Sequence, residues 1–218
     1  MKPTVRGFAI VATATLLLGC QTAYYSTMEK FGVHKRDILV DRVEEARDAQ
    51  EGAKEQFKSA LERFSSVLGF KGGDLQEKYD QLNAEFERSE SRAEEVSERI
   101  AAVEDVSEAL FDEWEDELEQ YTNASLRRSS QRQLTDTKRQ YAQLIAAMER
   151  AEEKIKPVLN AFRDQVLYLK HNLNARAIAS LKGELASVES NVAALIRDME
   201  RSIREADRFI QSMNRTGS

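Results

Sequence analysis

The fold is decided by residues 39–75, which read LVDRVEEARDAQEGAKEQFKSALERFSSVLGFKGGDL. Mostly apolar residues recur there at alternating steps of four and three, at Leu39, Val43, Ala46, Gln50, Ala53, Phe57, Ala60, Phe64 and Val67. This heptad spacing predicts an amphipathic α-helix that buries one stripe against a neighbouring helix. The glycine-rich segment 69–74 should end the helix, because glycine adopts left-handed conformations easily and Asp74 can cap the next helix.

The same spacing resumes after the glycines without a change of register, at Leu75, Tyr79, Leu82, Phe86, Ser89, Ala93, Val96, Ile100 and Val103. An antiparallel helical hairpin is therefore predicted over residues 34–121. Folding about the glycines should place Phe57 beside the region of Phe86, and Leu39 beside that of Val103.

The stripe fades in residues 121–130, where Ser and Asn side chains compete for backbone hydrogen bonds, so we expect a break or kink over 122–133. A second hairpin is predicted over 134–213, with its turn at 172–175 and a short tail at 214–218. Pro157 lies inside its first helix and should bend or restart that helix, because proline donates no backbone hydrogen bond.

The composition agrees with an all-α fold. The chain has 218 residues with only 2 prolines and 9 glycines, and 32% of its residues are charged. Elongated antiparallel hairpins of similar length can bury their stripes as an up-down-up-down four-helix bundle. Two hairpins laid end to end, or a coiled coil between copies of the chain, would also cover the stripes.

The N-terminus carries an export signal. Lys2 and Arg6 precede an apolar run at 8–18, and residues 17–20 read LLGC. This layout resembles the lipobox of bacterial lipoproteins, in which a signal peptide, here 1–19, is removed and the next cysteine, here Cys20, is acylated. An uncleaved anchor helix or a plain secretory signal would leave unexplained why the only cysteine lies at this position.

The lipobox likeness implies a location. Two or three acyl chains such as palmitate on Cys20 would hold the chain on its membrane far more firmly than one chain. Lipoproteins with aspartate after the cysteine tend to stay in the inner membrane, so Gln21 favours the outer membrane, facing the periplasm. Removing 1–19 takes away Lys2 and Arg6 and no acid, which changes the formal charge from −6 to −8. So acidic a chain is a poor nucleic-acid binder.

Residues 20–33 should form a lipidated juxtamembrane segment. Aromatic and cationic side chains alternate in and just after it, a mixture that suits the lipid headgroup layer. The candidate membrane-interface residues are Tyr24, Tyr25, Lys30, Phe31, Lys35 and Arg36. The alternative is that this stretch simply begins the first helix and packs on the bundle.

An acidic run lies near the end of the first hairpin, at Asp112, Glu113, Glu115, Asp116, Glu117 and Glu119. The hairpin should bring this run beside Lys30, Lys35 and Arg36. It is then either a solvated helix face or an electrostatic clasp made of weak exposed pairs. A divalent-cation site is a third reading, although a helix does not wrap oxygens around an ion as a calcium loop does.

The sequence shows no pattern of catalytic, cofactor-binding or metal-binding residues. His34 and His171 are the only histidines and should lie apart, and no second cysteine is available for a zinc site. Neither G-x-S-x-G nor a phosphate-binding loop occurs. We therefore expect no enzyme activity. Phe70 and Lys71, at the predicted hairpin tip, are candidate partner contacts, unless Phe70 folds back to cap the bundle.

Residues 24–43, YYSTMEKFGVHKRDILVDRV, with AR at 46–47 and AQ at 49–50, resemble an uncharacterised family of bacterial coiled-coil proteins, a domain-of-unknown-function family. The resemblance implies a helical protein, often a predicted lipoprotein, and transfers no functional residues. Two functions remain open. One is a structural or adaptor scaffold that holds a protein or cell-wall partner, and the other is a regulatory or small-ligand-binding bundle.

Overall fold

The computed structural model describes residues 33–69, 75–172 and 174–216. These residues form four helices, and the described part of the chain contains no strand, which confirms the all-α fold. The helices are α2 (Lys35–Leu68), α3 (Leu75–Gln120), α4 (Ala124–His171) and α5 (Ala175–Thr216). None of them has a stretch long and apolar enough to cross a bilayer.

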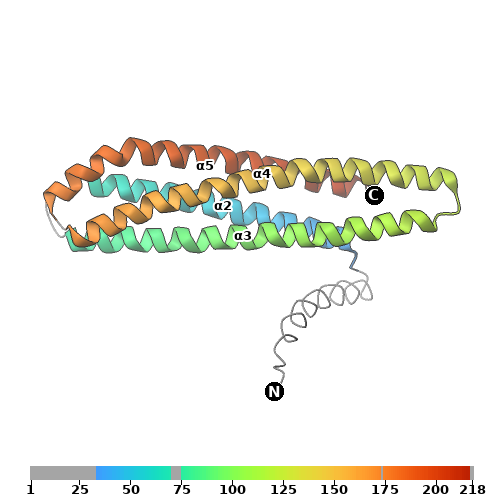
Figure 1. Ribbon diagram of the computed structural model, residues 1–218, viewed down its shortest axis with the longest axis horizontal. Helices are drawn as coiled ribbons and strands as arrows, with labels where there is room; N and C mark the ends of the chain where they lie inside the picture. Colours follow the sequence, from blue (N-terminus) through green and yellow to red (C-terminus); the bar gives the residue numbers. More distant parts are fainter. Residues whose placement is uncertain (1–32, 70–74, 173, 217–218) are drawn as a thin grey trace, which may run out of the picture.

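The helices form a four-membered ring. Each packs on two neighbours: α2 on α3 and α5, and α4 on α3 and α5. Figure 1 shows the two hairpins lying side by side as an elongated bundle. The predicted bundle is therefore confirmed, and the hairpins do not lie end to end.

The apolar stripes meet along the bundle axis as the heptads predict. Leu39, Phe57 and Phe64 of α2 are fully buried, and the ring of Phe64 meets that of Phe162 edge-on at 6.5 Å between centroids. The register of the first hairpin also agrees with the prediction. Gln56 Nε2 donates to Glu85 Oε2 at 2.8 Å, close to the expected pairing of Phe57 with Phe86.

The predicted break at 122–133 is wrong in its extent. Only residues 121–123 separate α3 from α4, and 124–133 are helical. The physical reason is capping: Asn123 Oδ1 accepts from the backbone N–H groups of Ser125 and Leu126 at 2.9 and 3.2 Å. Polar residues that compete with a helix interior therefore begin a helix here.

Pro157 does not restart its helix, because α4 runs through it without interruption. Its ring lies on the exposed side of α4, where water can satisfy the carbonyl that loses its helical partner. The turn predicted at 172–175 is confirmed: α4 ends at His171 and α5 begins at Ala175. Asn174 Oδ1 caps α5 by accepting from the N–H groups of Arg176 and Ala177.

The two ends of the bundle differ. We call proximal the end where α2 begins, α5 ends and α3 turns into α4, and distal the end with the α4–α5 turn. At the proximal end α3 and α4 continue beyond α2 and α5 (Figure 1). We call this projecting part, residues 114–133, the overhang. At the base of the overhang Phe111, Leu118 and Leu134 form a small core of their own, packed with Trp114 and Tyr141.

Candidate functional site

The predicted clasp between α2 and the acidic run is present at the proximal end. Lys35 Nζ lies 2.9 Å from Glu113 Oε1, and the Lys35 side chain is only 12% exposed. A second contact to the run comes from α4, where Lys138 Nζ lies 2.7 Å from Glu115 Oε1. The acidic run therefore joins three helices. Among the described residues, no three acids, histidines or cysteines are grouped so that they could hold a metal ion.

Several predicted site residues lie outside the described residues: Cys20, Tyr24, Tyr25, Lys30, Phe31, Phe70 and Lys71. Of the predicted membrane-interface residues the structure describes Lys35 and Arg36, both in the first turn of α2. Arg36 lines a small groove with Asp37 of α2 and Met213 of α5. Both cations thus lie at the proximal end, where the chain enters the bundle.

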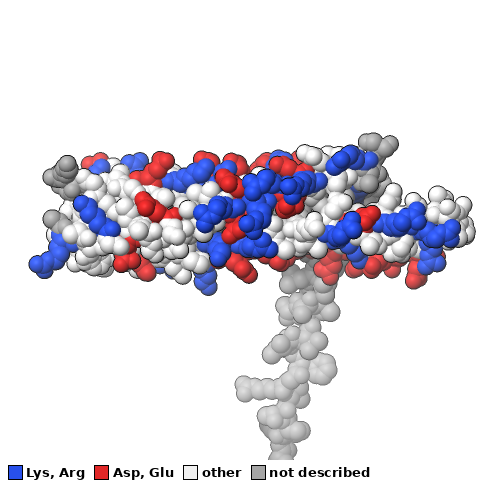
Figure 2. Space-filling view, turned by 90° about the horizontal axis from the view of Figure 1, so that it is seen from above, with Lys and Arg blue, Asp and Glu red and all other residues white. Residues whose placement is uncertain are grey.

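Charge is distributed unequally among the helices. Helix α3 contains 17 acidic and only 4 basic residues, whereas α4 contains 10 basic and 5 acidic residues. No basic residue follows Arg99 in α3. Figure 2, which views the molecule from the side of α4 and α5, shows Lys and Arg gathered across the middle of that face. The bundle therefore has one strongly acidic helix, α3, and a more basic face formed by α4 and α5.

The basic face contains a groove of about 650 Å³ between α4 and α5. Four arginines line it, Arg139, Arg150, Arg201 and Arg208, together with three alanines. Arg139, Arg201 and Arg208 each pair with an acid one turn away on the same helix, at 2.9, 3.6 and 2.6 Å respectively. Three of the four arginine charges are therefore compensated within their own helix, and Arg150 is the fourth cation that lines the groove.

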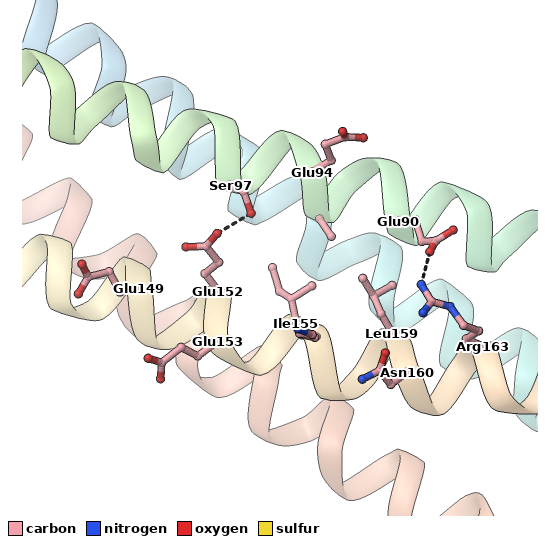
Figure 3. Close-up of a pocket in the computed structure, with 12 residues that line it drawn as sticks. Glu90, Glu94, Ser97, Glu149, Glu152, Glu153, Ile155, Leu159, Asn160 and Arg163 are labelled. Atoms are coloured by element: carbon pink, nitrogen blue, oxygen red, sulfur yellow. Dashed lines mark hydrogen bonds and ion pairs between the residues drawn. The ribbon is translucent and has the colours of Figure 1, made fainter. Parts of the chain in front are cut away.

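A wider groove of about 1120 Å³ runs between α3 and α4 near the middle of the bundle (Figure 3). Apolar side chains such as Ile155 and Leu159 lie in it, and carboxylates surround it. Two contacts cross the groove from one helix to the other. Ser97 Oγ of α3 donates to Glu152 of α4, and Arg163 of α4 pairs with Glu90 of α3 at 2.8 Å. These contacts tie α3 to α4 and leave an open surface groove.

Carboxylates near this groove influence one another. The pKa of Glu104 is raised by partial burial and by the negative charges of Glu149 and Glu152. Arg163 also lies over the ring of Phe86, at 5.7 Å from its centroid. These contacts balance charge between α3 and α4 along the groove.

The heptad pattern did not reveal the exposed apolar side chains at the two ends. At the proximal end Tyr121 and Leu126 are 40% and 57% exposed, and at the distal end Leu167 and Tyr168 are 50% and 40% exposed. Leu126 and Leu167 do not fall on the apolar stripe of their helix, but an off-stripe position alone does not show whether another helix packs on it. Such side chains have no role in the core and are available for contacts outside the bundle.

Two buried polar side chains interrupt the core. Gln50 of α2 and Ser202 of α5 are both fully buried, and their polar side-chain atoms have no hydrogen-bond partner in the structure. The two residues lie at a similar level, because Arg47 and Asp207 pair nearby at 3.2 Å. Gln50 was predicted as a stripe residue, and it is one. A buried polar residue of this kind can fix helix register at a cost in stability.

Residues 24–213 match the family described as protein of unknown function (DUF2959). The match covers α2, α3 and α4 completely and α5 up to Met213. A search of the curated proteins gave no match.

Proposed function

The chain belongs to this family of unknown function, and we propose that it is a lipid-anchored envelope lipoprotein acting as a structural or adaptor scaffold without catalysis. Cys20 carries the acyl chains, and the helical rod extends from the membrane toward a protein or cell-wall partner. The outer membrane, with the rod in the periplasm, is the proposed location.

The observation that carries the proposal is the filled core of the rod. One continuous set of buried apolar side chains runs from Ile38 and Met213 at the proximal end to Leu68 and Leu169 at the distal end. The grooves described above all lie on the surface, so the interior acts as support. A 46-residue helix such as α3 is about 70 Å long, which sets how far the rod can carry a contact.

The position of the anchor supports a spacer. The chain enters α2 at the proximal end, so a lipid at Cys20 would place the membrane on that side and the distal end away from it. Exposed Leu167 and Tyr168 lie at the distal end, on the last turns of α4. Aromatic and large apolar side chains that are exposed on a rigid element are typical contacts for a partner.

The anchor is tested with Cys20→Ser in cells supplied with a labelled fatty acid. We expect the wild type to incorporate label and to float with membranes, and the variant to lose both properties. Gln21→Asp is the matched control, because it changes the neighbouring residue and should keep the label. An unlabelled wild-type protein would contradict the lipoprotein proposal.

The scaffold role is tested with a photo-crosslinking residue in place of Tyr168 in intact cells. A similar substitution at Arg88, exposed on the side of α3, serves as the control. We expect a defined crosslinked product from the distal position only, and mass spectrometry would identify it. Equal or absent crosslinking at both positions would argue against a distal partner site.

A further inference from the structure

The geometry points to a second membrane contact: we propose that the tip of the overhang, formed by Tyr121, Leu126, Arg127 and Arg128, rests on the phospholipid headgroups beside the lipid anchor. The inference rests on the proposed function, because the anchor is what brings this end to a bilayer. The partner is the lipid surface itself.

The overhang lies at the end of the bundle where the chain enters α2. Lys35 marks where the chain enters the bundle, and it contacts Glu113. Residues 114–120 continue α3 beyond that contact by about 10 Å. Of the described chain, the overhang therefore projects furthest at the proximal end (Figure 1). The 14 residues between Cys20 and Lys35 span at most about 50 Å, so an acylated Cys20 keeps the bilayer within reach of the tip.

The tip of the overhang exposes apolar side chains beside cations. Leu126 is the most exposed large apolar side chain in the described part of the chain, at 57%, and Tyr121 lies across the turn from it at 40%. Leucine and tyrosine bury apolar surface in the headgroup region, and tyrosine keeps its hydroxyl in contact with water. Arg127 and Arg128 follow directly and are exposed. A guanidinium group binds phosphate oxygens through two parallel hydrogen bonds.

Two backbone N–H groups at the tip already have hydrogen-bond partners, which lowers the cost of burying them in the headgroup layer. Asn123 already satisfies the N–H groups of Ser125 and Leu126, so burying Leu126 does not leave these donors unpaired. Glu117 and Glu119 lie on the other side of the turn, so the tip presents charges of both signs. Zwitterionic headgroups such as phosphatidylethanolamine carry a phosphate and an ammonium group, and they match this mixture better than a purely anionic surface does.

The free energy gained by inserting the tip is small. Burying one leucine side chain does not by itself hold a free protein on a membrane. The lipid anchor changes this situation, because it keeps the tip at a high effective concentration near the surface. A weak contact is then enough to orient the rod relative to the membrane.

The experiment uses the acylated full chain in vesicles of phosphatidylethanolamine and phosphatidylglycerol. The only cysteine is Cys20, whose sulfur is acylated, so Leu126→Cys introduces a unique thiol for a polarity-sensitive fluorophore. Leu167→Cys is the matched control, because it lies on the same helix, is similarly exposed and sits at the distal end. Vesicles carrying nitroxide-labelled lipid report proximity by quenching, and circular dichroism checks that each variant is folded.

We expect the fluorophore at 126 to shift to shorter wavelength and to be quenched, and the fluorophore at 167 to do neither. Arg127→Gln combined with Arg128→Gln should reduce the quenching at 126, while Lys154→Gln combined with Lys156→Gln should not. If the protein floats with vesicles and position 126 is not quenched, the proposal is wrong and the anchor stands. A blue shift without quenching, together with a doubled mass, would assign the tip to a second copy and also overturn it. Failure to float would remove the anchor and this inference together.

Discussion

Lys35 Nζ lies 2.9 Å from Glu113 Oε1, and this contact ties the first turn of α2 to α3 while residues 114–120 continue past it. One ion pair thus marks both the entry of the chain into the bundle and the start of the overhang. The Lys35 side chain is 12% exposed and that of Glu113 34%, so the pair is partly shielded from water.

The pair should contribute modestly to stability. A double-mutant cycle with Lys35→Gln and Glu113→Gln should give a coupling free energy of about 0.5–1 kcal/mol, which falls as salt is added. Urea unfolding at low and high ionic strength measures it. The pair between Arg92 and Glu95, one turn apart on the exposed side of α3, is the control and should give a smaller coupling. Equal couplings would mean that partial burial adds nothing.

Replacing the buried Gln50 with leucine should stabilise the bundle by about 1–3 kcal/mol, because two unpaired polar atoms are removed from the core. Gln56→Leu is the matched control on the same helix. Gln56 donates to the buried Glu85 at 2.8 Å, so its loss should destabilise. Urea midpoints measure both changes. Destabilisation by Gln50→Leu would indicate that the Gln50 side chain has partners, such as a bound water molecule.

The buried edge-to-face contact of Phe64 with Phe162 predicts a large effect of truncating either ring. Phe162 is 1% exposed, so Phe162→Ala should cost about 3–5 kcal/mol through lost burial and the cavity left behind. Tyr168→Ala, at an exposed position of the same helix, should change the free energy of unfolding by much less. Thermal and urea unfolding distinguish these results, and similar losses for both would contradict the assigned burial.

The lowered pKa of Glu85 should make the stability of the bundle depend on pH. Burial alone would raise the pKa of Glu85, but hydrogen bonds from Arg88 and Gln56 outweigh burial, and the pKa is lowered from 4.5. A lowered folded-state pKa gives stability that is present above pH 4.5 and is lost as pH falls through the folded value. The stability difference between wild type and Glu85→Gln should therefore shrink in acid. Glu104→Gln should show the opposite sign, gaining stability above pH 4.5, because the pKa of Glu104 is raised.

Most of the fold could be predicted because it depends on local periodicity. The stripe through Leu39 and Phe57 and the glycines at 69–73 predict a hairpin, and similar lengths favour a four-helix bundle but leave hairpins laid end to end as an alternative. The extent of the 122–133 break could not be predicted, because one cap at Asn123 decides it. Ser and Asn favour caps and breaks equally in a sequence, and only the geometry distinguishes them.

The candidate surfaces were harder to predict than the core. The clasp of Lys35 with the acidic run followed from the hairpin register, since both partners lie on the helices that the register aligns. The exposure of Leu126 and Leu167 depends on where the helices end and on which side no neighbour packs. That information is tertiary, so a stripe of apolar letters does not contain it.

The separate small core at the overhang has a consequence for how the molecule opens. Phe111, Leu118 and Leu134 form a cluster apart from the main core, so this section can unfold locally while the four-helix part stays closed. Trp114 belongs to that section, is the only tryptophan of the chain, and donates to Ser130 Oγ at 2.8 Å. Its fluorescence should change at a lower denaturant concentration than the helical circular-dichroism signal, and amide hydrogens near Trp114 should exchange before those around Phe57. Coincident transitions would instead show that the rod unfolds as one cooperative unit.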